Sequence, residues 1–116
     1  MLPQAAVRQA GHVDIVDLEG RITMGEGCAL VRNAVRELVN AGSRNILLNL
    51  QGVSYVDSAG LGEMAGTYVT VAKLGGQLKL VHAQARIDNM LQVTKLYALL
   101  VAFSDEDAAL RSFDAA

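Results

Sequence analysis

The chain has 116 residues, of which 52% are hydrophobic, and its formal net charge is −2. This length fits one compact domain, which we expect to span residues 1–116, and the hydrophobic content excludes a disordered chain. The 10 basic and 12 acidic residues are scattered along the sequence, so it lacks the basic stripe that a nucleic-acid backbone requires.

The first half of the chain predicts two strands separated by a helix. Residues 13–18 begin with alternating apolar and polar side chains, which predicts a strand that ends at Gly20. Residues 25–41 carry apolar side chains at helical spacing, and residues 45–50 form the nearly continuous apolar run of a strand covered on both faces. Residues 1–9 either add an edge strand or fray.

A second helix begins near Ser58 and ends at Gly75-Gly76, where the glycines supply a C-terminal stop. Its apolar residues recur at helical spacing and predict one inward face. The members of this predicted face are Leu61, Met64, Ala65, Tyr68, Val69 and Ala72.

The remaining segments continue the alternation of strands and helices. Residues 77–82 predict a strand, residues 84–93 a shorter helix, and residues 98–103 a final buried strand. Residues 104–107 open a last helix, in which Ser104 is the expected capping hydroxyl because an acid follows three residues later. This order predicts an α/β fold, with α-helices packed against a mixed, mostly parallel sheet.

The most informative segment is residues 49–62, NLQGVSYVDSAGLG. Here a buried strand ends in a loop that delivers Asp57 and Ser58 to a helix N-terminus, where serine and aspartate are preferred caps. Gly60 and Gly62 remove side chains from the following turn, so that another backbone or surface can approach closely. Since a structural cap needs neither glycine, the pattern favours a docking surface.

This segment resembles the signature of the STAS-domain anti-sigma factor antagonists, in which a hydrophobic strand precedes a V-D-S-[SA]-G-L-G block. The serine after the aspartate is the phosphoacceptor of that family. The resemblance therefore implies that Ser58 is phosphorylated. It also implies that Asp57, Gly60, Leu61 and Gly62 belong to the partner-binding surface.

The resemblance further implies a partner-switching cycle. The unphosphorylated protein would bind an anti-sigma factor that is also a serine kinase, and would thereby free a sigma factor. The kinase would phosphorylate Ser58 with ATP, and a phosphatase would restore the hydroxyl. The chain would then be a ligand and a substrate rather than an enzyme, without a cofactor. We expect the kinase to contact the start of the second helix and the Gly20–Gly25 loop, including Thr23 and an exposed Met24.

The likeness covers about residues 13–112, with two departures. Family members commonly carry an acid in a pattern like G-E-[LI]-D, whereas residues 20–24 read GRITM. A Gly-Leu pair that often precedes the last strand is replaced by Lys95-Leu96. The first departure bears on recognition by the kinase, and the second on a turn.

Other interpretations share the fold or the motif. A STAS domain could instead serve as a stressosome scaffold or as a subunit of a lipid or anion transport complex.

Residues 60–65 match the dinucleotide pattern G-x-G-x-x-[GA], but the preceding strand ends too early and no acid follows at the distance that ribose binding requires. A serine hydrolase would need a base and a G-x-S-x-G elbow around Ser58. The two histidines and one cysteine are too widely spaced for a metal site.

The sequence also predicts a cellular location. Residues 1–4 lack the charged and apolar segments of a signal peptide. The longest apolar stretch, residues 98–103, is far shorter than the roughly 20 residues of a membrane span. Cys28 is the only cysteine, which fits a reducing compartment. We therefore expect a cytoplasmic protein without direct membrane insertion.

Overall fold

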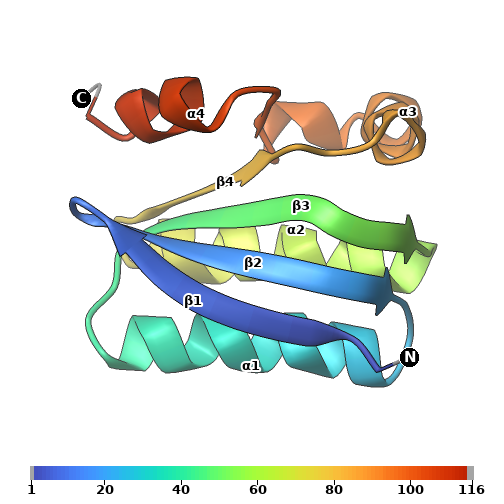
Figure 1. Ribbon diagram of the computed structural model, residues 1–116, viewed down its shortest axis with the longest axis horizontal. Helices are drawn as coiled ribbons and strands as arrows, with labels where there is room; N and C mark the ends of the chain where they lie inside the picture. Colours follow the sequence, from blue (N-terminus) through green and yellow to red (C-terminus); the bar gives the residue numbers. More distant parts are fainter. Residues whose placement is uncertain (1, 115–116) are drawn as a thin grey trace.

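The computed structural model describes residues 2–114, and its five strands form one mixed sheet in the order β1-β2-β3-β4-β5 (Figure 1). The strands are β1 (Gln4–Ala10), β2 (Val13–Ile22), β3 (Asn45–Val56), β4 (Gln77–Val81) and β5 (Ala102–Phe103). β1 runs antiparallel to β2, and every other neighbouring pair is parallel. The predicted mixed, mostly parallel α/β architecture is confirmed.

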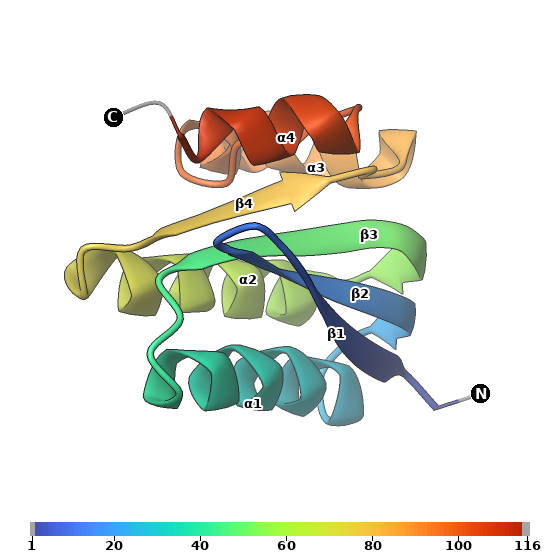
Figure 2. The ribbon, with the colours of Figure 1, turned by 60° about the vertical axis from the view of Figure 1, so that its left-hand side comes forward.

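The helices fall into two groups. They are α1 (Glu26–Asn40), α2 (Ser58–Lys73), α3 (Ala85–Thr94) and α4 (Glu106–Ser112), with a short 3₁₀ helix η1 (Leu96–Ala98) after α3. α1 and α2 pack against each other along one side of the sheet, and α3 and α4 gather beside β4 (Figures 1 and 2). Within residues 2–114, no helix is both long enough and apolar enough to cross a bilayer.

The sheet is buried on both faces where β2, β3 and β4 run side by side. On one face Ile15, Leu47 and Val81 meet Ala109 of α4 and Phe113, the residue that follows this helix. The other face carries the larger cluster, which joins the sheet to α1, α2 and α3. Its strand residues include Val16, Ile46, Leu48 and Leu80. The apolar run at 45–50 is thus a strand covered on both faces, as its pattern predicted.

Polar contacts tie α4 to the sheet. The Arg8 guanidinium on β1 lies 2.7 Å from a carboxylate oxygen of Asp17 and 2.6 Å from one of Glu106. Its hydrogen bonds lower the pKa of both carboxyl groups. On β4, the Lys79 ammonium donates to the Ser112 carbonyl at 3.0 Å. These contacts lie far along the chain from Ser58.

Three strands differ in extent from the sequence predictions. β2 continues through Gly20 to Ile22, because Gly20 adopts φ 92° at an irregularity in the pairing with β3 and so bends the strand without ending it. β3 runs on to Val56 rather than ending at residue 50, and it leads directly into α2. The predicted strand 98–103 is reduced to Ala102–Phe103, because η1 and a turn occupy the residues before it. Residues 4–10 form the edge strand that was one of two expectations for the N-terminal segment.

The predicted inward face of α2 is partly wrong. Leu61 and Met64 are buried as expected, but Val69 is 42% exposed and Ala72 is also exposed. Thr67 and Val71 are buried in their place. Apolar residues on this helix form two overlapping stripes, and the packing partners select one of them.

Two turns also differ from simple expectation. Asp105, not Ser104, caps α4, because its carboxylate accepts the Ala108 N–H at 2.9 Å. Lys95 ends α3 in the left-handed conformation, with φ 62°. Glycine adopts this conformation most readily, and the Lys95-Leu96 departure noted in the sequence falls at this turn.

Candidate partner-binding site

Asp57 is the N-cap of α2 and fastens two loops together. One of its carboxylate oxygens accepts the backbone N–H of Gly60 at 2.7 Å, and the other accepts the N–H of Met24 at 3.0 Å. These two hydrogen bonds favour the ionised carboxylate and hold the pKa of Asp57 below its usual range. The loop between β2 and α1 is thereby attached to the start of α2.

Ser58 is the first residue of α2, and its side chain is exposed. Within residues 2–114 its hydroxyl has no hydrogen-bond partner, so the prediction that Ser58 shares the capping with Asp57 is wrong. A cap must precede the first helical residue, and Asp57 already occupies that position. The exposed Ser58 hydroxyl therefore takes no part in capping α2. A negative charge placed on it would lie at the positive end of the α2 dipole.

The two glycines of the motif have different roles. Gly60 is buried, and a β-carbon there would collide with the backbone carbonyl of Ile22 at the end of β2. Gly62 is exposed, and a β-carbon there would meet no atom within 4 Å. The expected close approach is therefore made at Gly60 by the backbone of Ile22, inside the molecule, whereas Gly62 is accessible from outside. Partner binding at these two residues stays a prediction.

The predicted residues of the β2–α1 loop lie beside this turn. Met24 is 80% exposed, as predicted, and its N–H is held by Asp57. Thr23 is half-buried, and its carbonyl accepts the N–H of Cys28 at 3.0 Å. Leu61, in contrast, is 2% exposed. The surface that a partner can reach here consists mainly of Met24, Ser58 and Gly62.

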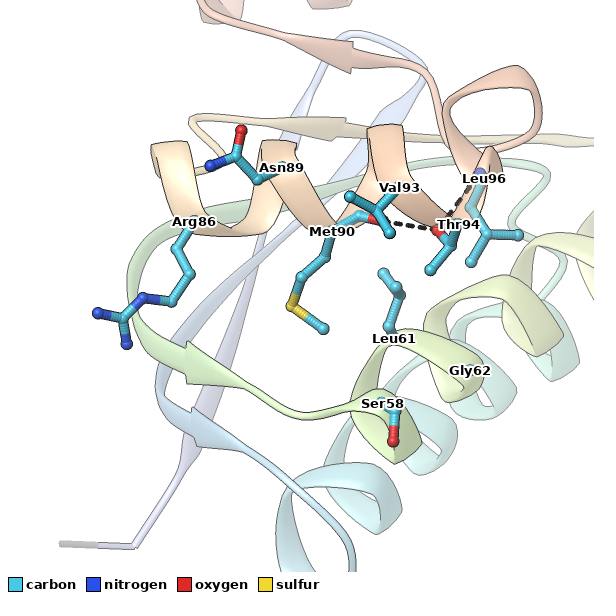
Figure 3. A pocket seen from close by; sticks show the side chains of 9 residues that line it. All are labelled: Ser58, Leu61, Gly62, Arg86, Asn89, Met90, Val93, Thr94 and Leu96. Atoms are coloured by element: carbon cyan, nitrogen blue, oxygen red, sulfur yellow. Dashed lines mark hydrogen bonds between the residues drawn. The ribbon is translucent and has the colours of Figure 1, made fainter.

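A groove that no sequence pattern indicated lies between α2 and α3 and begins at Ser58. Its volume is about 440 Å³. Leu61 and Met90 point into it from the two helices, and Val93 and Leu96 line its far part (Figure 3). Arg86 lies at the end of the groove opposite Val93 and Leu96 (Figure 3). Because the two walls are separated by strand β4 in the sequence, only the tertiary structure brings them together.

No arrangement suited to a metal ion accompanies this surface. In the described part of the chain, no three histidine, cysteine, aspartate or glutamate side chains are grouped so that they could hold one. The His12 side chain pairs with Asp114 at 3.0 Å, away from α2.

Comparison with known proteins gives a consistent result. Residues 4–109 match the STAS domain family. The anti-sigma-B factor antagonist of Bacillus subtilis is 33% identical over 90 residues, which cover 78% of this chain and 72% of that protein.

Two solved structures share the fold. An anti-sigma factor antagonist from Mycobacterium paratuberculosis is 20% identical, with a TM-score of 0.86 over 97% of this chain and 94% of that chain. The Bacillus cell fate determinant SpoIIAA in its phosphorylated form is 17% identical, with a TM-score of 0.71 over 94% of this chain and 99% of that chain.

The contrast between the two glycines is testable through stability. Gly60→Ala should lower the free energy of unfolding by at least about 2 kcal/mol, because the new methyl group collides with a backbone carbonyl that cannot rotate away. Gly62→Ala should raise it by up to about 1 kcal/mol, because alanine is the better helix former. Urea unfolding of both variants checks this prediction. Equal effects of the two substitutions would contradict it.

The attachment made by Asp57 predicts a pH dependence. Its pKa is lower in the folded chain than in the unfolded chain, so the ionised carboxylate stabilises the fold above about pH 4. This contribution is lost as the pH falls through the folded-state pKa. Asp57→Asn keeps a capping side chain but removes the charge. Its melting temperature should be a few degrees below that of the wild type at pH 7, and the difference should shrink below about pH 4. A difference that stays constant down to pH 2.5 would show that the charge is unimportant.

Proposed function

The chain belongs to the STAS domain family, and from this premise we propose that it is an anti-sigma factor antagonist switched by phosphorylation of Ser58. In this proposal it binds an anti-sigma factor with serine kinase activity and thereby frees a sigma factor. The observation that carries the proposal is the exposed Ser58, whose hydroxyl is free and lies at the start of α2. Met24 and Gly62 are exposed beside it.

The relatives support the two halves of this proposal. The Bacillus subtilis relative is an anti-sigma-B factor antagonist. SpoIIAA, which shares the fold, exists in a phosphorylated form. Ser58, which follows Asp57 in the motif, is the acceptor that we propose for this chain.

The geometry explains why phosphorylation would act on binding rather than on folding. A phosphoryl group adds about −1.5 to −2 charges, and on Ser58 it would meet the positive end of α2, where anions are stabilised. Asp57 would keep its hydrogen bonds to Gly60 and Met24, because the Ser58 side chain takes no part in them. A partner lying close over Gly62, however, would have to desolvate the phosphate. That cost is expected to weaken the complex.

In this cycle the protein is a ligand and a substrate. The kinase supplies ATP, magnesium and the catalytic base, and a phosphatase later restores the hydroxyl of Ser58. The chain itself would catalyse no reaction and bind no cofactor. We place the cycle in the cytoplasm, in agreement with the single cysteine, Cys28.

The phosphoacceptor can be identified directly. Incubation with the cognate kinase and ATP should add one phosphate at Ser58, located by mass spectrometry, and Ser58→Ala should abolish it. Ser54→Ala is the matched control, because Ser54 is also exposed and lies four residues away. This variant should still be phosphorylated at Ser58. Ser58→Ala should also leave the melting temperature unchanged, since the hydroxyl caps nothing. Phosphate on Ser54, Thr67 or Ser104 with Ser58 unmodified would refute the assignment.

The docking surface can be tested with two glycines one helical turn apart. Gly62→Leu should weaken kinase binding at least about a hundredfold, because a side chain would hold the partner away from Ser58. Gly66→Leu is the control, since Gly66 is also exposed on α2 and a β-carbon there also meets no atom within 4 Å. Isothermal titration calorimetry measures both variants, and thermal melts confirm that both fold. Equal affinities of the two variants would exclude the first turns of α2 as the contact.

A further inference from the structure

We propose that the groove between α2 and α3 binds a single-chain amphiphile with an anionic head group, such as a medium-chain carboxylate. The head group would pair with Arg86, and the alkyl chain would lie over Leu61, Met90 and Val93. Binding requires neither a kinase nor phosphorylation, so it stands independently of the proposed function.

The groove is apolar and open to solvent. Its floor is formed by Leu61 and Met90, which point toward each other from α2 and α3 (Figure 3). At its rim Val93 is 84% exposed, the most exposed large hydrophobic side chain among the described residues. Its volume of about 440 Å³ lies within the range of small-molecule sites. Apolar surface of this kind gains free energy when a ligand displaces the water over it.

Among the described residues that line the groove, Arg86 is the only charged one. It lines the groove through its side-chain carbons, and its guanidinium points away from Met90, beyond the end of the groove (Figure 3). Arg86 is exposed and, within residues 2–114, forms no ion pair or side-chain hydrogen bond, while no acidic side chain lines the groove. Arg32, in contrast, is paired with Glu63 on the opposite side of α2, at 3.0 Å. An unpaired guanidinium beside an apolar channel favours an anion, and its fork geometry suits a carboxylate.

The spacing of the lining residues along α3 indicates the shape of a ligand that would fit the groove. Arg86, Met90 and Val93 are separated by four and three residues, so they share one face of the helix. Arg86 therefore lies at one end of a stripe that continues through Met90 and Val93 to Thr94, and Asn89 also lines the groove. With a rise of 1.5 Å per residue, the distance along α3 from Arg86 to Val93 is roughly 10 Å, and Leu96 extends the stripe further. An alkyl carboxylate such as decanoate matches this order of charge and apolar surface.

Gly62 and Ser58 form the wall opposite α3. The missing side chain of Gly62 leaves the wall open, since a β-carbon there would meet nothing within 4 Å. A chain bound in the groove would consequently lie beside Ser58 and could hinder its phosphorylation. This consequence rests on the proposed function, whereas the binding itself does not.

The experiment is a titration of the ¹⁵N-labelled full chain with decanoate below its critical micelle concentration, followed by NMR. Saturable shifts are expected at Gly62, Met90 and Val93. Octanoate should bind about tenfold more weakly, because two fewer methylene groups are buried. Arg86→Gln should weaken decanoate binding about tenfold and leave the binding of uncharged decan-1-ol unchanged. Arg36→Gln, an exposed arginine on α1, should change neither.

A second pair of variants tests the apolar part. Val93→Ser should weaken both decanoate and decan-1-ol, while Val69→Ser, at an exposed position on α2 outside the groove, should not. Both side chains lie at the surface, so both variants should fold, and thermal melts verify this.

Three results would overturn the proposal. The first is either the absence of saturable shifts of the groove amides with decanoate, or a dissociation constant for decanoate that is the same in the wild type and in Arg86→Gln. The second is a shift of the same amides with rising protein concentration and no ligand, because a second copy would then cover the groove. The third is a set of groove amides that do not shift with decanoate but do shift when the cognate anti-sigma factor is added. That result would assign the groove to a protein partner and would leave the proposed function intact.

Discussion

The site depends on how closely two helix N-termini pack against the last residue of β2. A β-carbon on Gly27 at the start of α1 would lie 2.7 Å from the Ile22 α-carbon, and one on Gly60 would collide with the Ile22 carbonyl. That carbonyl also accepts the Asp57 N–H at 3.4 Å. Because both helices converge on Ile22, the loops that precede them lie side by side. The Met24–Asp57 hydrogen bond then fixes their relative position.

The rest of the fold is secured away from this point. The cluster beneath α4 and the Arg8 contacts with Asp17 and Glu106 involve neither α1 nor α2. At Ser58, the exposed side chain contributes no hydrogen bond to this framework. A chemical change there can therefore alter what the surface binds while the core stays intact. This separation suits a protein whose regulation acts on an interface.

The first turns of α2 serve the interior and the surface at once. Gly60 packs against Ile22 and Leu61 forms part of the groove floor, while Ser58 and Gly62 are exposed. The groove beside them opens because α3 contributes only Ile87 and Leu91 to the fully buried core and leaves Val93 in solvent. A partner over Ser58 and an amphiphile along α3 would share the wall formed by Gly62. Occupancy of one could then influence the other.

The sequence by itself determined the alternation of strands and helices, the strand at 45–50 covered on both faces, and the segment in which Asp57 and Ser58 begin a helix. Each of these follows from local periodicity or local backbone chemistry, which neighbours in the chain are sufficient to define. Only the tertiary structure decided that Asp57 alone caps α2 and that Val69 faces solvent. It also decided that Gly60 permits close packing against Ile22, whereas Gly62 is accessible at the surface. It also created the groove between α2 and α3. These features depend on which elements lie against each other, and residues such as Ile22 and Gly60, or Leu61 and Met90, meet in space although no spacing along the chain relates them.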